Sequence, residues 1–276
     1  EIFPSGTLIQ SSAAPSSLPA RLPPAPTAAP EPFVYRSPSI LGSAPQPPSE
    51  SFRPATSNPS PFKGEVDIVS VAHRGDDPNN EYVTLRRSGS VSSQSVINIS
   101  GWTIENNKGE QAFVPQAANI VLFDIPGPIQ FKAGEEAIVT IGAGYGTSFR
   151  ENRCIGYLNE FTSFTPSFNE SCPRFSTNEL LAQKLNGVCI DLISRTRNCQ
   201  QVQFSYEDSR AGNDCIAFAQ IHLNYSGCVK DNRASANFFS SSWRVFLKRN
   251  STMFDSFHDH AILRDANGLI VSEYQY

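Results

Sequence analysis

Residues 95–105 read SVINISGWTIE, and apolar residues alternate with polar ones on both sides of Trp102. Alternation of this kind is typical of a β-strand with one buried face. Gly101 permits a tight bend, and Trp102 then delivers a large apolar side chain to the interior. The stretch therefore predicts an antiparallel β-sandwich with Trp102 in its core.

The segments on both sides of this stretch repeat the alternating pattern. Val83 and Leu85 fall on one face of a predicted strand, and Trp243 opens the alternating run WRVFLK. These three residues join Trp102 in the predicted core. Several short strands separated by turn residues are typical of an antiparallel sandwich or barrel. The expected strands cover residues 65–72, 81–86, 95–105, 119–123, 136–141, 243–248, 261–264 and 269–274, the last two joined by a hairpin turn at Asn267-Gly268.

Residues 149–240 have a different character, because they contain all six cysteines of the chain. Thr177 is the expected N-cap of a first helix, and Gly187 is its expected stop. A helical excursion from a small sandwich has a thin core of its own, and disulfides are the usual remedy. The predicted helices of this disulfide-rich insert cover residues 177–186, 188–196 and 213–222.

The cysteines predict an oxidising compartment. Their number is even, none belongs to a C-x-x-C pair, and their spacing matches no zinc or redox pattern. We therefore expect three disulfides, with every connectivity open. The chain begins with Glu1 rather than Met, so either it was shortened or a signal peptide was removed. The six cysteines favour the second explanation, and with it an extracellular or cell-surface location. The predicted disulfide cysteines are Cys154, Cys172, Cys189, Cys199, Cys215 and Cys228.

Residues 1–62 form a Pro-, Ser- and Ala-rich arm that carries 15 of the 21 prolines. Prolines at this density exclude helices and remove ladder donors, so the composition predicts an extended, polyproline-like segment. Short apolar islands in the arm could dock in grooves or add a strand to a sheet edge of a neighbouring subunit. A wall-spanning spacer and an arm folded onto its own body are the alternatives. The predicted anchors are Ile2, Phe3, Leu8, Ile9, Phe33, Val34, Tyr35, Ile40 and Leu41.

The residues after the arm resemble the lamin-tail domain, an immunoglobulin-like β-sandwich. The segments that carry the resemblance are 66–69 (VDIV), 81–85 (EYVTL), 99–104 (ISGWTI), Phe113, 132–135 (KAGE), 243–247 (WRVFL) and 258–263 (HDHAIL). The cysteine-rich insert departs from that pattern. Its segments 152–157, 171–173 and 223–229 are similar to secreted lamin-tail proteins of candidate-phyla (Patescibacteria) bacteria. The resemblance implies a binding or scaffolding role and carries no catalytic machinery.

Several functional classes are disfavoured. The formal net charge is −4 with a pI near 5.6, and no basic stripe is present to neutralise nucleic-acid phosphates. The apolar runs are too short to cross a bilayer. No Walker loop, Rossmann fingerprint, G-x-S-x-G or H-E-x-x-H motif occurs. We therefore expect neither an enzyme nor a bound cofactor.

A few motifs could bind ligands, but ordinary readings explain them. His258, His260 and Asp265 could approach one another across the terminal hairpin and hold a divalent ion, yet surface histidines are usually hydrogen-bonding groups. The oxygen-rich loop 76–81 lacks EF-hand spacing, and turn chemistry explains its residues. The Arg-Gly-Asp tripeptide 74–76 matches an integrin-binding motif, but a turn between two strands explains it in the same way. Chance explains the Asn-x-Ser/Thr acceptors in a bacterium: Asn98, Asn169, Asn224 and Asn250.

These observations predict three parts: an arm (1–62), a lamin-tail sandwich (63–148 plus 241–276) and a six-cysteine insert (149–240). The leading hypothesis is a structural subunit of a self-assembling surface filament or layer, with the arm of one subunit docked on its neighbour. The alternative is a monomeric adhesin or ligand-binding module with the arm as a stalk and the insert as its recognition surface.

Overall fold

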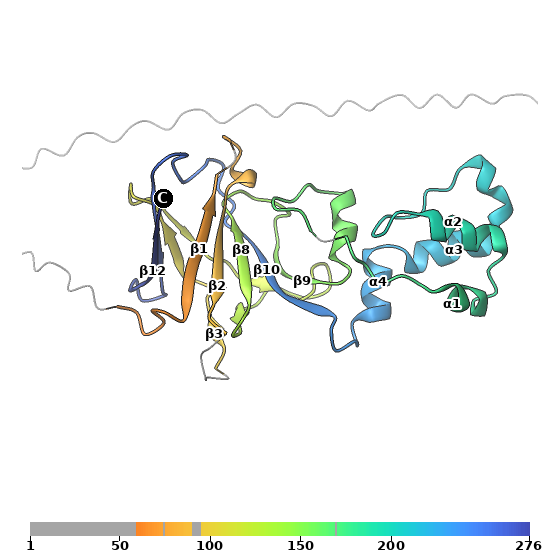
Figure 1. Cartoon of the computed structure of the whole chain (residues 1–276), viewed down its shortest axis with the longest axis horizontal. Helices are drawn as coiled ribbons and strands as arrows, with labels where there is room; N and C mark the ends of the chain where they lie inside the picture. Colours follow the sequence, from red (N-terminus) through yellow and green to blue (C-terminus); the bar gives the residue numbers. More distant parts are fainter. Residues whose placement is uncertain (1–58, 74, 90–94, 169) are drawn as a thin grey trace, which may run out of the picture. The chain divides into compact units, whose positions relative to one another are not determined.

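The computed structural model describes residues 59–73, 75–89, 95–168 and 170–276. The described residues all belong to one compact unit of the chain. All nine predicted arm anchors lie outside the described residues. The described part is mainly β-structure, with helices concentrated in the cysteine-rich segment (Figure 1).

The larger sheet has six strands in the order β1-β2-β8-β10-β9-β6. The pairs β8–β10 and β6–β9 are parallel, whereas β1–β2, β2–β8 and β9–β10 are antiparallel. The predicted antiparallel pairing therefore holds for most strand pairs in the described residues, and these two parallel pairs depart from it. Parallel strands need a crossover, and the chain between β8 and β10 supplies one through β9 and the cysteine-rich segment. The strands are β1 (Val66–Ala72), β2 (Tyr82–Arg87), β6 (Ala117–Ala118), β8 (Glu136–Thr140), β9 (Ser148–Asn152) and β10 (Phe239–Phe246).

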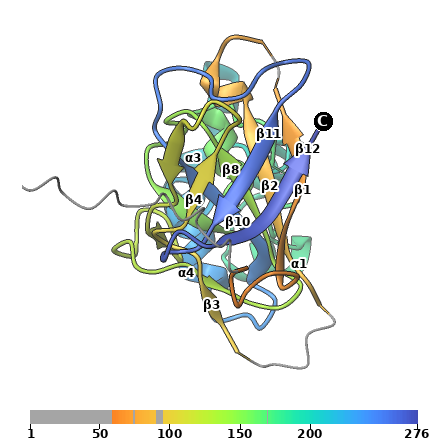
Figure 2. The same ribbon diagram turned by 90° about the vertical axis from the view of Figure 1, so that its left-hand side faces the viewer.

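A second sheet has the order β12-β11-β4-β5, and β3 pairs with β7 in a separate ladder. The β11–β12 hairpin turns as predicted: the Asp265 carboxylate accepts from the amides of Asn267 and Leu269, and Gly268 has φ +78°. Figure 2 shows this hairpin beside β1, where the Ile68 amide donates to the Ser272 hydroxyl. The strands are β3 (Ile97–Asn98), β4 (Thr103–Glu105), β5 (Gln111–Phe113), β7 (Gln130–Phe131), β11 (His260–Arg264) and β12 (Ile270–Gln275).

The main apolar core lies between the two sheets. Val83, Leu85, Trp102 and Trp243 are all buried in it. The Phe62 ring packs on Trp102 with ring centroids 5.4 Å apart. Residues 59–62, which the composition assigned to the arm, therefore belong to the body.

Two buried carboxylates tie loops to this core. Glu81 accepts from the amides of Met253 and Phe254 at 2.7 and 2.9 Å. Glu135 accepts from the Trp243 indole at 2.9 Å and pairs with Arg150. Because each carboxylate has several donors, its burial is compensated. Sequence patterns alone gave no sign of either role.

Residues 119–123 form a turn and not the predicted strand. The Asp124 carboxylate accepts from the Ile120 amide at 2.8 Å, and the Phe123 amide donates to the Ile120 carbonyl. These local bonds satisfy the backbone without a sheet partner, so the apolar run leaves the sheet after β6. Leu122 adopts a left-handed conformation with φ +68°.

The helices begin and end differently from the prediction. Ser176, not Thr177, is the N-cap of the first helix, where Ser176 and Glu179 form a capping box. Gly187 starts the second helix instead of stopping the first, because Asn186 caps it. The fourth helix was not predicted as a helix. The helices are α1 (Thr177–Ala182), α2 (Gly187–Arg195), α3 (Gly212–His222) and α4 (Tyr225–Asn232), with 3₁₀ helices η1 (Pro78–Asn80), η2 (Ile155–Glu160) and η3 (Tyr206–Ala211).

The cysteine-rich segment has two apolar clusters and three disulfides. One cluster joins β9, η2 and α4, and the other lies among α1, α2 and α3, which pack together (Figure 1). All six predicted cysteines are oxidised, and their pairs are Cys154–Cys228, Cys172–Cys199 and Cys189–Cys215.

Candidate binding site

The structure does not gather the predicted metal candidates. His258 lies in a bend before β11 and not on a strand with His260. Asp265 lies beyond the other end of β11, where its buried carboxylate accepts from the Ser60 hydroxyl at 2.7 Å. Within the described ranges, no three His, Cys, Asp or Glu side chains are placed to hold a metal ion.

The loop 76–81 uses its oxygens for its own turn. Asp77 caps η1 because its carboxylate accepts from the Asn79 amide, while Glu81 is buried in the core. Arg74 of the Arg-Gly-Asp tripeptide lies outside the described residues. Turn chemistry therefore accounts for the part of this loop that the structure describes.

The four glycosylation acceptors have different surroundings. The Asn98 side chain accepts from the Ser100 amide, Asn224 caps α4, and Asn250 is exposed. Asn169 lies outside the described residues. The bonds of Asn98 and Asn224 give both side chains ordinary structural roles.

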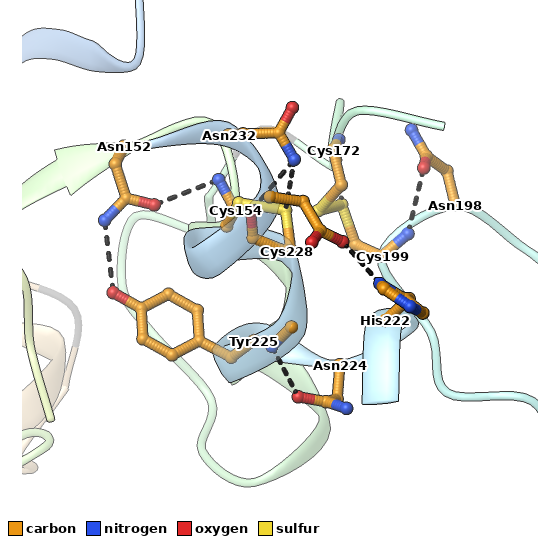
Figure 3. The surroundings of a disulfide bond; sticks show 12 residues. Asn152, Cys154, Cys172, Asn198, Cys199, His222, Asn224, Tyr225, Cys228 and Asn232 are labelled. Carbon is orange, nitrogen blue, oxygen red and sulfur yellow. Dashed lines mark hydrogen bonds and ion pairs between the residues drawn. A yellow bond between two sulfur atoms is a disulfide. The ribbon is translucent and has the colours of Figure 1, made fainter. Parts of the chain in front are cut away.

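A rigid corner forms where β9, η2 and α4 meet, around the Cys154–Cys228 disulfide (Figure 3). The side-chain oxygen of Asn152 (Oδ1) accepts from the Cys154 backbone amide at 3.0 Å, and its side-chain nitrogen (Nδ2) donates to the Tyr225 hydroxyl at 3.1 Å. All four residues are buried. Burial raises the pKa of Tyr225 well above its usual value, so the phenol stays protonated.

The start of α4 is fixed on its other side. Asn224 accepts from the Gly227 amide at 2.9 Å and donates to the Gln220 carbonyl at 2.6 Å. A Cβ atom on Gly227 would collide with the Ile221 carbonyl, so only glycine permits this approach of α3 and α4. The backbone at Tyr225 is thus held by a disulfide, a cap and a close helix contact.

An apolar pocket of about 390 Å³ opens beside this corner, and we call it the Tyr225 pocket. Leu158 and Tyr225 are buried in its wall, whereas Leu122 and Phe161 stand at its rim, 67 % and 65 % exposed. Tyr145 adds a further aromatic ring. The amides of Gln201 and Asn224 and the hydroxyl of Ser226 provide hydrogen-bonding groups. An aromatic pocket with few polar groups is the usual composition of a binding site.

Leu122 is hard to explain by folding alone. A left-handed backbone costs a non-glycine residue about 1–2 kcal/mol. The side chain it displays is apolar and mostly in solvent, so its burial does not offset that cost. Strained residues often mark binding sites, and adjoining exposed apolar groups often mark interaction surfaces. Leu122 and Phe161 are both mostly exposed, and both line the Tyr225 pocket.

Sequence reasoning missed this pocket because its wall comes from five segments that are distant in the sequence. The run 119–123 looked like a strand, and the helix of Tyr225 was not recognised. The available signals were Asp124, which can cap a turn, and Asn224, a strong N-cap residue before an apolar one.

A second pocket, of about 350 Å³, is polar. Its lining includes Asn80 and Thr165, which hydrogen bond to each other at 2.8 Å, and Asn79, which accepts from the Gly144 amide. Arg244 lies over the Phe168 ring and donates to the carbonyl oxygen of Pro166. Most of these groups are already paired, which leaves a hydrophilic hollow rather than a reactive centre.

Comparison with known proteins gives no family for this chain: no protein-family model matches it, and no curated protein is significantly similar in sequence. Among the helices in the described ranges, none is long and apolar enough to cross a membrane.

Proposed function

We propose that this chain is an exported, non-catalytic structural subunit of a bacterial cell-surface filament or layer, in which the arm of one subunit binds the body of the next. The observation that carries the proposal is the Tyr225 pocket, an apolar binding surface with strained and exposed side chains at its rim. An apolar pocket built without catalytic groups suits the capture of another chain.

The disulfides support export. Three buried disulfides persist in oxidising compartments and are rare where thiols are kept reduced. They also hold the helical segment, whose apolar clusters are small. An extracellular or cell-surface location follows from this chemistry as part of the proposal.

The proposal includes a sandwich of the lamin-tail, immunoglobulin-like type and a Patescibacteria source. Gly101-Trp102 and the closing hairpin of β11 and β12 support the type of sandwich. Such domains serve as binding or scaffolding modules. In this proposal the arm of one copy binds the pocket of another, so the two contacting surfaces differ. Contacts between different surfaces of identical subunits produce closed rings or open filaments.

Negative-stain microscopy and light scattering test this proposal. The full chain is compared with a chain that lacks residues 1–58. The cut falls before Pro59 because Ser60 and Phe62 pack on the body. We expect filaments, sheets or large oligomers from the full chain and folded monomers from the shortened one. Equal assembly of both chains would contradict a role for the arm.

The polar pocket favours a second candidate function, a monomeric adhesin with the arm as a stalk. Amide and hydroxyl groups such as those of Asn80 and Thr165 suit a polyhydroxylated ligand. This candidate predicts monomers from both chains and binding to a glycan array. The Thr165→Val variant should lose that binding without a change in thermal stability greater than about 1 kcal/mol.

A further inference from the structure

We propose that the Tyr225 pocket is the acceptor site for the arm segment Phe33-Val34-Tyr35-Arg36 of a second copy of the chain. The inference rests on the proposed function and deepens it by naming the two surfaces that meet. It commits to one occupant among the apolar islands of the arm.

The chemistry of the pocket suits an extended, proline-flanked segment. Tyr145, Tyr225 and Phe161 supply aromatic surface, and Gln201, with its side-chain amide, belongs to the same lining. Polyproline-like chains have no internal hydrogen bonds, so their backbone carbonyls are free to accept from such donors. Aromatic grooves recognise these chains because little conformational entropy is lost on binding.

The segment 33–36 has the sequence features that such a pocket requires. Pro32 precedes it and Pro38 follows it, which restricts the free chain. Phe33 and Tyr35 are the only aromatic pair in the arm. A pocket of about 390 Å³ is small for a ligand site, so it accommodates one or two large side chains.

The charges around the pocket favour the apolar island 33–35 over the other three islands of the arm, 2–3, 8–9 and 40–41. Asp124 and Glu160 are exposed and lie within two residues of the rim residues Leu122 and Phe161. Both carboxylates accept only from backbone amides, those of Ile120 and Gln201, and in the described part of the chain neither has a cationic partner within 4.0 Å.

Arg36 directly follows Tyr35, whereas the other apolar islands have no adjacent basic residue. An arginine beside two acidic rim groups would favour the correct register of the docked segment. The tether is also long enough to reach a neighbour. The 22 residues between Arg36 and Pro59 span up to about 70 Å when extended.

Sedimentation velocity of the full chain tests the inference with three variants. Phe161→Ser removes a rim residue, Tyr35→Ser removes an anchor, and Phe113→Ser is the matched control. Phe113 is 66 % exposed, as Phe161 is at 65 %, but it lies on β5 in the other sheet. We expect Phe161→Ser and Tyr35→Ser each to weaken self-association roughly tenfold or more. Phe113→Ser should associate as the wild type does. Equal thermal melts of all chains would show that folding is unaffected.

A mixing experiment distinguishes contacts between copies from contacts within one. The Phe161→Ser chain keeps an intact arm and the Tyr35→Ser chain keeps an intact pocket, so their mixture should form dimers and nothing longer. Wild-type assembly with an unaffected Phe161→Ser variant, or no dimer in the mixture, would overturn the inference and leave the proposed function standing. A wild-type chain that stays monomeric would overturn both.

Discussion

The sandwich and the cysteine-rich segment solve the same folding problem in different ways. The sandwich buries one large cluster that includes Trp102, Trp243 and Phe131, and it contains no disulfide. The cysteine-rich segment divides its apolar residues between two smaller clusters and contains every disulfide of the chain. A small core supplies too little hydrophobic free energy to hold short helices, and covalent links supply the rest.

The difference has a functional consequence. The Tyr225 pocket lies on the disulfide-fixed side, where apolar residues such as Leu122 and Phe161 remain exposed. Because disulfides hold the backbone there, the segment can keep these apolar side chains exposed to solvent without rearranging to bury them. Four predictions would break or sharpen this comparison, and they follow in order of expected effect.

Removal of the Cys154–Cys228 disulfide should have one of the two largest effects. The Cys154→Ser/Cys228→Ser chain frees a loop closed over a sequence separation of 74, which should cost about 4 kcal/mol of unfolding free energy. Hydrogen exchange should show faster exchange in α4 and η2 while β2 and β8 stay protected. Uniform loss of protection across both regions would contradict the separation that we describe.

Truncation of the sandwich core should produce the opposite pattern. Trp102 is almost fully buried, so Trp102→Ala should lower the unfolding free energy by about 3–5 kcal/mol. Under oxidising conditions the helices around Cys189–Cys215 should retain helical circular dichroism after the sheets have melted. Simultaneous loss of both signals would show that the two regions unfold as one cooperative unit.

Gly156 provides a smaller and more local test. A Cβ atom there would lie 2.5 Å from the Cys199 sulfur, so Gly156→Ala should overpack η2 and lower the unfolding free energy by about 1–3 kcal/mol. Gly187→Ala is the control, because Gly187 has open space and starts α2. That control should be neutral or stabilise the chain. Equal thermal denaturation midpoints for the two variants would refute the close approach.

The smallest effect concerns pH and the sandwich. The hydrogen bonds of Arg264 hold the pKa of Glu105 below its ordinary value of 4.5. A carboxylate with a lowered folded pKa stabilises the fold above its unfolded pKa, and this stabilisation is lost as the pH falls through the folded value. Glu105→Gln should therefore be less stable than the wild type at pH 7, by about 0.5 kcal/mol. The difference should shrink below about pH 4.5. Urea titrations across this range would measure it, and a constant difference would disprove the pairing.

The sequence predicted the sandwich better than the site. Short runs of β-branched and apolar residues bounded by turn residues located β1, β2, β8 and the β11–β12 hairpin. The same reasoning failed at residues 119–123, where the Asp124 carboxylate replaces a sheet partner. It also missed the parallel β8–β10 pair, because a crossover through another region leaves no local pattern.

The pocket depends on such non-local contacts. Tyr225 takes its position from Asn152 and from a disulfide whose pairing could not be read from the spacing of the cysteines. Leu122 has a left-handed backbone conformation, and no neighbouring residue type predicts that conformation from the sequence. Long-range pairing therefore decided the site, while local pattern decided most of the fold.

Photo-cross-linking tests the central claim most directly. Benzoylphenylalanine replaces Tyr35 in an unlabelled chain, which is mixed with ¹⁵N-labelled wild type and irradiated. We predict cross-links from position 35 to ¹⁵N-labelled peptides that contain Leu122, Phe161 or Tyr225, because these residues form the acceptor pocket of a second copy. Cross-links confined to unlabelled peptides of the same chain, or to the sandwich strands of the labelled chain, would contradict the account.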